Sequence, residues 1–584
     1  MRRFSALTIN FVISCALSVS ALVSAGVYAA ERFTGQDTDR VASQSISYAA
    51  VAADQLGAVA TVHPLATQAG IDVLARGGNA VDAAIAAALT LGVVDGHNSG
   101  IGGGLFALVH WADGRVEAID GREMAPMAAH RDMYLDEHGK AVGSMSQVGA
   151  LAIGVPGSVA AFEYLSKTGG KLSLRELILP AAALAERGFA IDKIYAGRLA
   201  RNAATLSQFD GSKAVLFDSH GKPYAAGSLL QQPDLAETYR GIAREGADYF
   251  YRGNFAEKIA VWMRANKGLI TAQDMANYTI SIREPVKSRY GDYTVYGFPP
   301  PSSGGVHVAQ ILQMLDQFPL ATLPVDERYH LLGETMKLAF ADRAYWLGDP
   351  DFVPVPKGLV NTDYTRALSQ KINRKQATVV TGHQQPPNAK VNLFGKHTTN
   401  ISAADKDGNW IAITSTVNTN FGSKVIIPGT GVIMNNQMDD FSIQPGVPNA
   451  YGLVGADANS IAPGKRPLSS MSPTLVLHNG KPVMTVGAAG GPTIISQVVQ
   501  ALVNHLTLGL PLYDAVAAPR VHQQWQPDQL FVEDTLSADI KEQLQERGHK
   551  LGQLGPYGST TAIGLNEKGE FVPVAEPRLK IRNQ

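Results

Sequence analysis

Two adjacent threonines, Thr398 and Thr399, head the stretch 398–409, and a second threonine-rich stretch, Thr414-Ser-Thr-Val-Asn-Thr-Asn-Phe-Gly422, follows it closely. A threonine hydroxyl is a poor nucleophile unless a base activates it, and the α-amine of an N-terminal threonine is such a base. An internal threonine gains that amine only when the chain is cut before it. The hypothesis from these residues is therefore a proenzyme that cleaves itself between His397 and Thr398.

Both stretches have the two-residue period of β-strands. Residues 398–404 and 410–416 are joined by Asp405-Lys-Asp-Gly-Asn409, a sequence that favours a hairpin turn. Thr414, Thr416 and Asn418 are expected to share one face of the second strand. Taken singly, Thr398 is weak evidence of catalysis, because strands contain many threonines.

Gly490 and Gly491 form a second feature that could take part in catalysis. They follow a predicted strand, 482–486, and precede Pro492 and a helix predicted over 494–506. Backbone N–H groups at such a helix start can stabilise a tetrahedral oxyanion, and glycine allows close approach of a substrate.

A nucleotide phosphate loop is the rival interpretation of the glycine clusters. No Lys-Ser/Thr pair follows Gly490 and Gly491, as a P-loop requires. In the other cluster, Gly100-Ile-Gly102, Leu105 stands where a dinucleotide motif needs glycine or alanine. Both nucleotide interpretations are therefore disfavoured.

The elements around these residues predict a mixed α/β (or α+β) chain built in layers. Residues 49–125 have a strand–helix–strand pattern, with Asn79 and Asp82 as a helix cap and a strand at 105–109. Residues 150–280 look mostly helical, and the loop 298–305 opens a further helix. The side chains expected on one face of another helix are Leu332, Met336, Ala339 and Phe340.

Composition limits the possible classes of protein. The 584 residues are 45% apolar and 17% charged, which indicates a globular protein. That length alone would suggest several domains. The net charge is −1, with no basic run outside the N-terminus, which argues against a nucleic-acid partner.

Residues 1–29 have the pattern of a cleaved secretory signal. Arg2 and Arg3 precede a short apolar stretch, 11–27, and small residues stand before Ala30. A membrane anchor is the alternative, but the stretch is short for a span of about 20 residues and lacks a basic flank. We expect a periplasmic protein with no membrane segment once the signal is removed.

Metal and thiol chemistry are not predicted for the mature chain. The only cysteine, Cys15, lies inside the signal, which excludes cysteine catalysis and thiolate ligands after its removal. The histidines show no paired spacing beside carboxylates. We expect neither a metal nor an organic cofactor.

Residues 398–422 resemble the signature of the γ-glutamyltranspeptidases (glutathione hydrolases), which are N-terminal nucleophile hydrolases. Similarity runs from about residue 50 to the C-terminus, in blocks that follow the family order: 121–126, 299–305, 347–352, 435–441, 465–474 and 487–492. The resemblance implies a four-layer αββα sandwich. It also implies that a large subunit, 30–397, and a small catalytic subunit, 398–584, form a heterodimer with one shared core.

The resemblance also implies roles for individual residues. Thr398 would be both the self-cleaving residue and the nucleophile, hydrogen-bonded by Thr416. The α-ammonium of a γ-glutamyl group would be held by Asn418, Gln437 and Asp440. Its α-carboxylate would be held by Arg122, Ser469 and Ser470.

These residues also have plain structural explanations: a turn carboxylate for Asp440, a surface cation for Arg122 and an ordinary loop for the two serines. Tyr451, in the loop 445–452, matches a lid found in some family members, but a surface connection would look the same. One departure concerns Asn400, where the family usually has histidine. Asparagine keeps hydrogen-bonding capacity and loses ring bulk and titration near neutral pH.

The implied partners are glutathione and other γ-glutamyl compounds as donors, with water, amino acids or peptides as acceptors. A related acylase acting on glutaryl side chains is the nearest alternative. A glutaryl group lacks the α-ammonium, so its binding would leave Asp440 without a counter-ion, which costs free energy. An exported binding protein that never cleaves itself is an alternative from a different class.

Overall fold

The computed structural model describes residues 47–386, 399–445, 447–450, 453, 457–555 and 558–579. The chain divides into two compact units, Met1–Ser47 and Tyr48–Gln584, and every element named below belongs to the second. The proposed signal, His397, Thr398 and Tyr451 lie outside the described residues.

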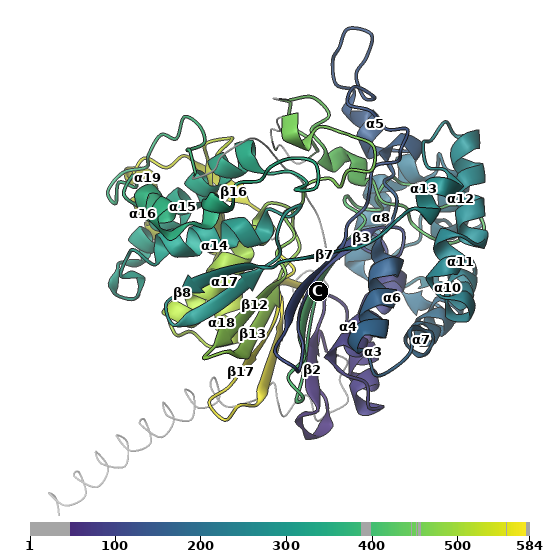
Figure 1. Ribbon diagram of the computed structural model, residues 1–584, viewed down its shortest axis with the longest axis horizontal. Coiled ribbons are helices and arrows are strands. Elements are labelled where there is room, and N and C mark those ends of the chain that lie inside the picture. The colour runs from purple at the N-terminus through teal and green to yellow at the C-terminus, as the bar shows by residue number, and fades with distance from the viewer. Residues whose placement is uncertain are drawn as a thin grey trace, which may run out of the picture. The chain divides into compact units, whose positions relative to one another are not determined.

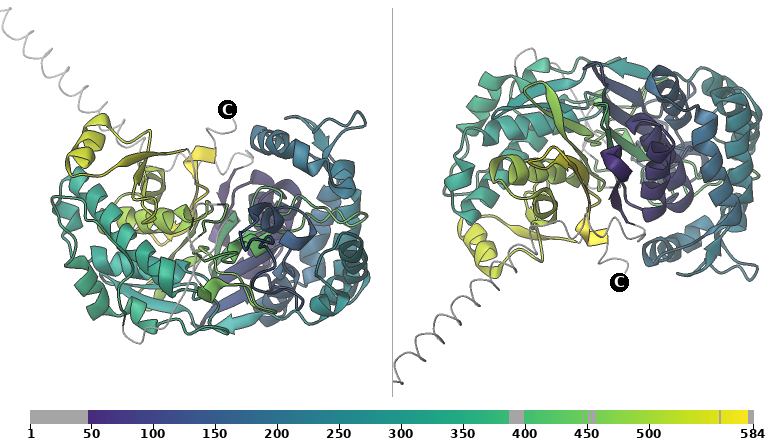
Figure 2. Two further views of the ribbon diagram at one scale, coloured as in Figure 1. Left: turned by 90° about the horizontal axis from the view of Figure 1, so that it is seen from above. Right: turned by 90° about the horizontal axis from the view of Figure 1, so that it is seen from below.

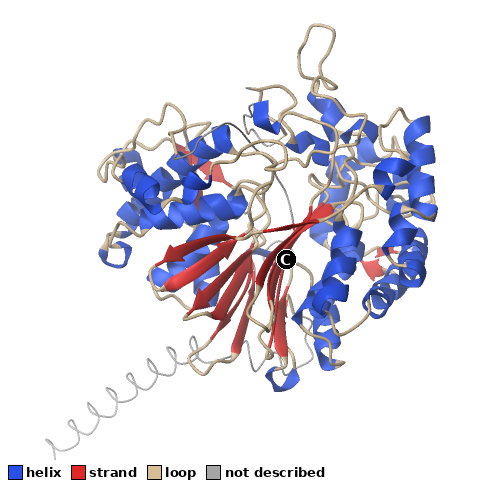
Figure 3. Cartoon of the chain, in the orientation of Figure 1, coloured by secondary structure: helices blue, strands red, loops and turns tan. Residues whose placement is uncertain are grey.

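Two β-sheets form the centre of this unit (Figures 1 and 3). The seven-stranded sheet has the order β1-β2-β10-β11-β3-β4-β7. Its strands are Ala49–Val51, Gly57–Ala60, Thr399–Asp405, Trp410–Thr416, Gly104–His110, Val116–Gly121 and Ser281–Arg283. All pairs within it are antiparallel.

The six-stranded sheet has the order β18-β17-β13-β12-β9-β8. Its strands are Phe571–Ala575, Thr561–Leu565, Lys481–Gly487, Thr474–His478, Tyr293–Gly297 and Val286–Tyr290. Two small sheets lie outside the central pair: β14-β15-β16 (Val521–His522, Leu530–Glu533, Leu551–Leu554) and β5-β6 (Phe189–Ala190, Leu229–Leu230).

The two large sheets pack face to face, and alternation along the strands explains why. Apolar side chains on the inner faces form one cluster, in which Phe106 of β3 stacks on Phe298 with ring centroids 4.1 Å apart. Residues of the opposite parity, such as Ile401 and Ile411, join the core under the helices. Each sheet is therefore buried on both sides, as its nearly continuous apolar strands require.

Helices cover the outer face of each sheet and complete four layers (Figures 1 and 2). Beside the seven-stranded sheet lie α3 (Pro64–Ala75), α4 (Ala80–Val94), α6 (Ser158–Gly169), α7 (Leu174–Arg187) and α10 (Pro233–Glu245). Beside the six-stranded sheet lie α14 (Gly304–Leu315), α15 (Val325–Trp346), α16 (Thr362–Ser369), α17 (Thr493–Leu502), α18 (Leu512–Ala517) and α19 (Ala538–Glu546).

Five of the remaining helices extend the first helical layer: α8 (Lys193–Leu206), α9 (Asp210–Leu216), α11 (Ala247–Tyr251), α12 (Asn254–Ala265) and α13 (Ala272–Ala276). Helix α5 (Gly143–Gln147) packs against the short helical turns Ala150–Ala152 and Gln437–Asp440. The fold is therefore the αββα sandwich of the N-terminal nucleophile hydrolases, as predicted, and residues 150–280 are mostly helical, as predicted.

Segments from before and after Thr398 interleave in both sheets. Strands β10 and β11 lie between β2 and β3, and β12 lies beside β9. Neither part of the chain could complete a sheet without the other. Two fragments made by a cut before Thr398 would therefore share one core.

Several predicted elements are confirmed in detail. Strands β10 and β11 form the expected hairpin, and Asn79 and Asp82 form a complete capping box on α4. The helix predicted to 506 is α17, which ends at Leu502 and continues as a π-helical turn over Val503–Thr507.

Candidate active site

The start of β10 is fixed on both faces of its sheet. Thr399 points toward the helices, where its Oγ1 donates to Asp95 Oδ2 over 3.1 Å. Asn400 points toward the second sheet, where its Nδ2 donates to Thr561 Oγ1 over 2.8 Å and its Oδ1 accepts from Thr414 Oγ1 over 3.0 Å. The backbone directly after the predicted cleavage site is therefore held from two sides.

The space around Asn400 is tight. A Cβ placed on Gly487 of β13 would lie 2.2 Å from Asn400 Oδ1, so only glycine fits opposite this side chain. Asn400 is fully buried and bridges the two sheets through hydrogen bonds alone.

Thr416 ends β11 and supports the turn that follows. Its Oγ1 accepts a hydrogen bond from the backbone N–H of Asn418 over 2.8 Å. Asn418 lies beyond the strand with φ of +77°, so the prediction that it shares a strand face with Thr414 and Thr416 is wrong. The chain turns at Asn418 because asparagine tolerates the left-handed region better than most residues.

Asn418 connects this turn to a short helical turn, Gln437–Asp440. Its Nδ2 donates to the carbonyl of Asn436 over 3.0 Å. Within the turn, Gln437 Nε2 donates to Asp440 Oδ2 over 2.6 Å, and Gln437 Oε1 is a buried acceptor with no hydrogen-bond partner among the described residues. Gln437 and Asp440 are therefore directly hydrogen-bonded, and Asn418 is bonded to the backbone of the residue that precedes Gln437.

Arg122 joins these hydrogen bonds from the first half of the chain. Its Nη2 donates to Asp440 Oδ2 over 2.5 Å, and both side chains are fully buried. The guanidinium also donates to the carbonyls of Pro467 and Leu468. Arg122 is therefore not a surface cation, and it is directly paired with Asp440.

Ser469 and Ser470 follow these two carbonyls. Both are fully buried, and Ser470 Oγ accepts a hydrogen bond of 2.7 Å from Nη2 of a second buried arginine, Arg343. The predicted carboxylate-binding residues are thus brought together, along with a cation that the sequence prediction lacked.

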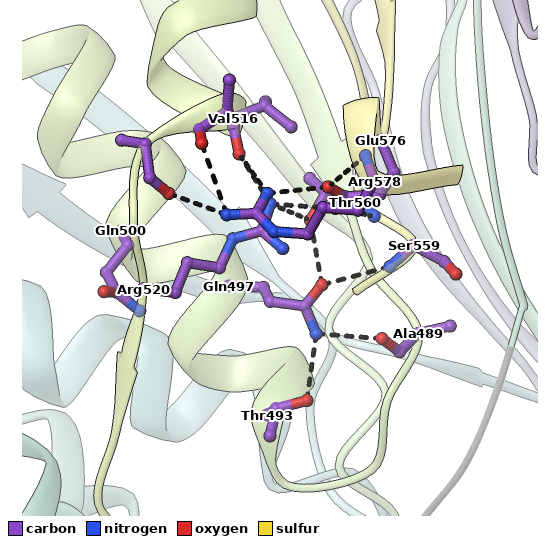
Figure 4. Close-up of polar contacts among 12 residues, drawn as sticks. Ala489, Thr493, Gln497, Gln500, Val516, Arg520, Ser559, Thr560, Glu576 and Arg578 are labelled. Carbon is purple, nitrogen blue, oxygen red and sulfur yellow. Dashed lines mark hydrogen bonds and ion pairs between the residues drawn. The ribbon is translucent and has the colours of Figure 1, made fainter. Parts of the chain in front are cut away.

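Gly490 and Gly491 lie between β13 and α17, both with positive φ (133° and 66°). Gln497 of α17 holds this loop through its Nε2, which donates to the Ala489 carbonyl and to Thr493 Oγ1 (Figure 4). Thr493 Oγ1 in turn donates to the Gly490 carbonyl over 2.7 Å. The glycine loop is therefore held in one conformation.

Comparison with known proteins identifies the family. The family model for γ-glutamyltranspeptidase matches residues 66–582. The chain belongs to the γ-glutamyltranspeptidase family.

Among its relatives, the glutathione hydrolase proenzyme of Escherichia coli K12 is 42% identical over 526 residues, with 89% of this chain and 90% of the relative covered. The solved cephalosporin acylase of Bacillus halodurans is 30% identical and superposes with a TM-score of 0.79, covering 89% of this chain and 94% of that one. The γ-glutamyltranspeptidase of Helicobacter pylori is 40% identical with a TM-score of 0.53, covering 54% and 91%.

Two buried charged residues of this family member were not among the predicted site residues. Glu123 is fully buried beside Arg122, with its Oε2 3.5 Å from Arg122 Nη1. Burial raises the pKa of Glu123 to about 8, although Arg122 opposes the shift. Glu123 stands inside the matched block 121–126, whereas Arg343 stands in a helix outside any block and carried no sequence signal.

Among the described residues, no group of three or more histidine, cysteine, aspartate or glutamate side chains is arranged to hold a metal ion. In the same part of the chain, no helix is both long enough and apolar enough to cross a membrane.

Proposed function

We propose that this chain is a self-cleaving γ-glutamyltransferase and glutathione hydrolase whose nucleophile is Thr398. The observation that carries the proposal is a set of buried hydrogen bonds on adjoining segments: Thr416 to Asn418, Asn418 to the Asn436 carbonyl, and, from the next residue, Gln437 to Asp440, which also binds Arg122. It contains an anionic and a cationic group, and it begins at the end of β11, where Ser415 pairs with Thr399 of β10. An α-amino acid group carries the complementary pair of charges.

Maturation begins with attack of the Thr398 hydroxyl on the carbonyl of His397. The peptide nitrogen leaves, so that an ester joins residue 397 to the Thr398 oxygen and the α-amine becomes free. Water then hydrolyses this ester, giving a carboxylate on His397 and a free hydroxyl on Thr398. The products are a large subunit, 30–397, and a small subunit, 398–584.

In turnover the free α-amine takes the proton of the Thr398 hydroxyl as the oxygen attacks the γ-amide of the donor. Backbone N–H groups of the Gly490–Gly491 loop stabilise the oxyanion of the tetrahedral intermediate. The leaving amine takes up a proton, and a γ-glutamyl ester remains on Thr398. Water or an acceptor amine then attacks that ester and regenerates the hydroxyl.

Recognition of the donor uses both charged groups, Asp440 and Arg122. Asp440, with the side-chain oxygens of Asn418 and Gln437, accepts hydrogen bonds from the α-ammonium. Arg122 and the hydroxyls of Ser469 and Ser470 donate to the α-carboxylate. Tyr451 closes over the bound donor from its loop.

Export places this enzyme in the periplasm after removal of residues 1–29. There it meets glutathione and other γ-glutamyl compounds as donors. Amino acids, peptides and water serve as acceptors.

Denaturing electrophoresis of the purified protein tests the proposal. We expect two bands with a mass ratio of about two to one, the smaller beginning at Thr398 by N-terminal sequencing. A Thr398→Ala variant is expected to give one full-length band and no activity. Full activity toward glutathione from an uncut chain would overturn the proposal, and an uncut, inactive wild type would favour an exported binding protein.

A glutaryl acylase activity is the second candidate function, and the ion pair between Arg122 and Asp440 supports it. Because Arg122 already compensates Asp440, a glutaryl group would not leave that carboxylate without a counter-ion, so the cost predicted from the sequence is smaller. The similarity to the cephalosporin acylase points the same way. Comparison of kcat/KM for a γ-glutamyl anilide and its glutaryl counterpart separates the two activities.

A further inference from the structure

The side-chain amide of Gln497 joins the glycine loop of the proposed active site to the residues before β17. We propose that Gln497 and Thr493 are positioning residues that turn the N–H groups of Gly490 and Gly491 toward the reacting carbonyl oxygen of the donor. This inference rests on the proposed γ-glutamyl activity, in which these two N–H groups stabilise the oxyanion. It assigns to that activity two side chains that neither the sequence pattern nor the family resemblance marked.

Two hydrogen bonds fix the direction of the peptide units that contain these N–H groups. Gln497 Nε2 donates to the Ala489 carbonyl over 2.9 Å, and Thr493 Oγ1 donates to the Gly490 carbonyl over 2.7 Å. In a planar trans peptide unit, the C=O and the N–H point in opposite directions. Because both carbonyls face side chains of α17, the N–H groups of Gly490 and Gly491 face away from those side chains.

Glycine allows close packing in this loop but does not itself fix the direction of the peptide units. Gly490 and Gly491 have φ of +133° and +66°, and a Cβ on Gly490 would lie 2.5 Å from Thr493 Oγ1. Glycine adopts both signs of φ about equally, so the bonds to the two carbonyls must supply the direction. Among the described residues, neither glycine N–H has a hydrogen-bond acceptor, which leaves both able to bind an oxyanion.

The other end of the Gln497 amide determines which way round the amide stands (Figure 4). Its Oε1 accepts from the Ser559 N–H over 3.3 Å and from Thr560 Oγ1 over 3.0 Å. A backbone N–H only donates and the Ala489 carbonyl only accepts, so a reversed amide would place like groups together. Gln497 is buried, and its Nε2 uses its second proton to donate to Thr493 Oγ1 over 3.0 Å. Its orientation is therefore set on both sides.

The glycine loop leaves its sheet beside the first residues of β10. Strand β13 ends at Gly487, where a Cβ would lie 2.2 Å from Asn400 Oδ1, and β10 begins one residue before Asn400. Thr561, which follows Thr560, accepts a hydrogen bond from Asn400 Nδ2 over 2.8 Å. The segment that anchors the amide and the strand that follows the predicted cleavage site are therefore in direct contact.

The first test replaces one nitrogen of the amide with oxygen. Gln497→Glu keeps the acceptor that faces Ser559 and Thr560, but it places a second oxygen, in place of the donor, against the Ala489 carbonyl. Two facing acceptors repel each other, so we expect kcat for the γ-glutamyl anilide to fall about 10- to 100-fold. KM should change by less than about threefold, because the oxyanion exists only in the transition state and the intermediate. An unchanged kcat would overturn the inference.

Gln500→Glu is the matched control on the same helix. Gln500 is also buried, and its Nε2 donates to the carbonyls of Ser496 and Val521 instead of to the glycine loop. We expect both glutamate variants to have a lower Tm than wild type, with a large fall of kcat only in Gln497→Glu. An equal fall of kcat in both would show general damage to α17 and would contradict the inference.

Variants of Thr493 cover the case in which Gln497→Glu does not cut itself. Thr493→Val removes the hydroxyl that binds the Gly490 carbonyl and keeps the shape of the side chain, whereas Thr493→Ser keeps the hydroxyl. We expect kcat to fall about tenfold in Thr493→Val and to stay within about threefold of wild type in Thr493→Ser. Equal kcat in these two variants, beside an active wild type, would defeat the inference alone. A wild type that neither cuts itself nor uses the γ-glutamyl anilide would defeat the proposed function, and the inference with it.

Discussion

Thr399 Oγ1 donates a hydrogen bond to Asp95 Oδ2, which ties the first residue of β10 to the C-terminal cap of α4. The turn that begins at Asp95 also holds the residues that follow β11, whose Ser415 pairs with Thr399. The Asn98 carbonyl accepts from the N–H of Val417, and the His97 carbonyl accepts from the N–H of Phe421. One turn therefore sets the start of β10 relative to the residues around Thr416.

Removal of the Thr399 hydroxyl tests whether this link assists maturation. Thr399→Val keeps the shape of the side chain and leaves a buried carboxylate with one donor fewer, at a cost of about 1–3 kcal/mol. We expect slower appearance of the two subunits, by about tenfold, followed on gels after expression. Thr322→Val, at an exposed turn, is the control and should mature at the wild-type rate. Equal rates for both variants would show that the link is dispensable.

The same carboxylate makes stability depend on pH. Burial raises the pKa of Asp95 to about 7, while Arg198, Asn98 and Thr399 oppose the shift and Asp192 adds to it. Between about pH 4 and 7 the folded chain binds a proton that the unfolded chain has lost. Stability from this group is therefore greatest below pH 4 and falls as pH rises to about 7.

Asp95→Asn should remove that slope. The free energy of unfolding of the wild type, minus that of Asp95→Asn, is expected to fall by a few kcal/mol as pH rises from about 4 to about 7. One pKa unit corresponds to about 1.36 kcal/mol. Urea titrations at pH 4.5 and 7.5 measure the difference. A constant difference between the two proteins at both pH values would contradict the prediction.

Asn400 allows a test of the departure from the family pattern. Asn400→His would place a larger ring against Gly487 and Thr561, where no free space remains. Overpacking of this kind costs about 1–3 kcal/mol. We expect a lower Tm and slower maturation by calorimetry and gels, with Asn277→His, at the exposed C-cap of α13, as the control. A variant as stable as wild type would mean that the neighbouring strands adapt.

The sequence predicted the layers of this fold because each layer has a local signal. Three of these signals can be recognised in the sequence alone: the period of two in residues 399–416, the helix cap at Asn79 and the alanine-rich helix that follows it. The same approach placed Asn418 on a strand face, which failed because the left-handed turn at that residue depends on its bond to Thr416 and not on period.

Partners distant in sequence could not be predicted. Arg343 is 127 residues from Ser470 in the sequence, and Arg122 is 318 residues from Asp440. A local sequence pattern therefore cannot predict either pairing. Resemblance to the family supplied Arg122 and Asp440 as two separate binding groups. Their direct ion pair, which changes the expected discrimination between γ-glutamyl and glutaryl groups, comes from the fold alone.

The C-terminal segment carries a second buried charge cluster that can be tested separately from catalysis (Figure 4). Arg578 donates to Glu576 and Glu533 and to the carbonyls at the end of α18, and Arg520 also pairs with Glu576. Burial raises the pKa of Glu576, but Arg520 and Arg578 outweigh it, so the net pKa is lowered. The stability that this carboxylate adds is present above its unfolded value and is lost as pH falls.

Arg578→Ala removes one cation from this cluster and leaves Glu533 and Glu576 under-compensated. Breaking a buried pair in this way costs about 3–5 kcal/mol. We expect a clearly lower Tm at pH 7 and a smaller loss near pH 4, where the carboxylates of the variant can take up protons. Arg244→Ala, whose exposed ion pair with Glu237 contributes little, is the control. If Arg578→Ala and Arg244→Ala had the same Tm, the cluster would not be stabilising the attachment of the C-terminal segment.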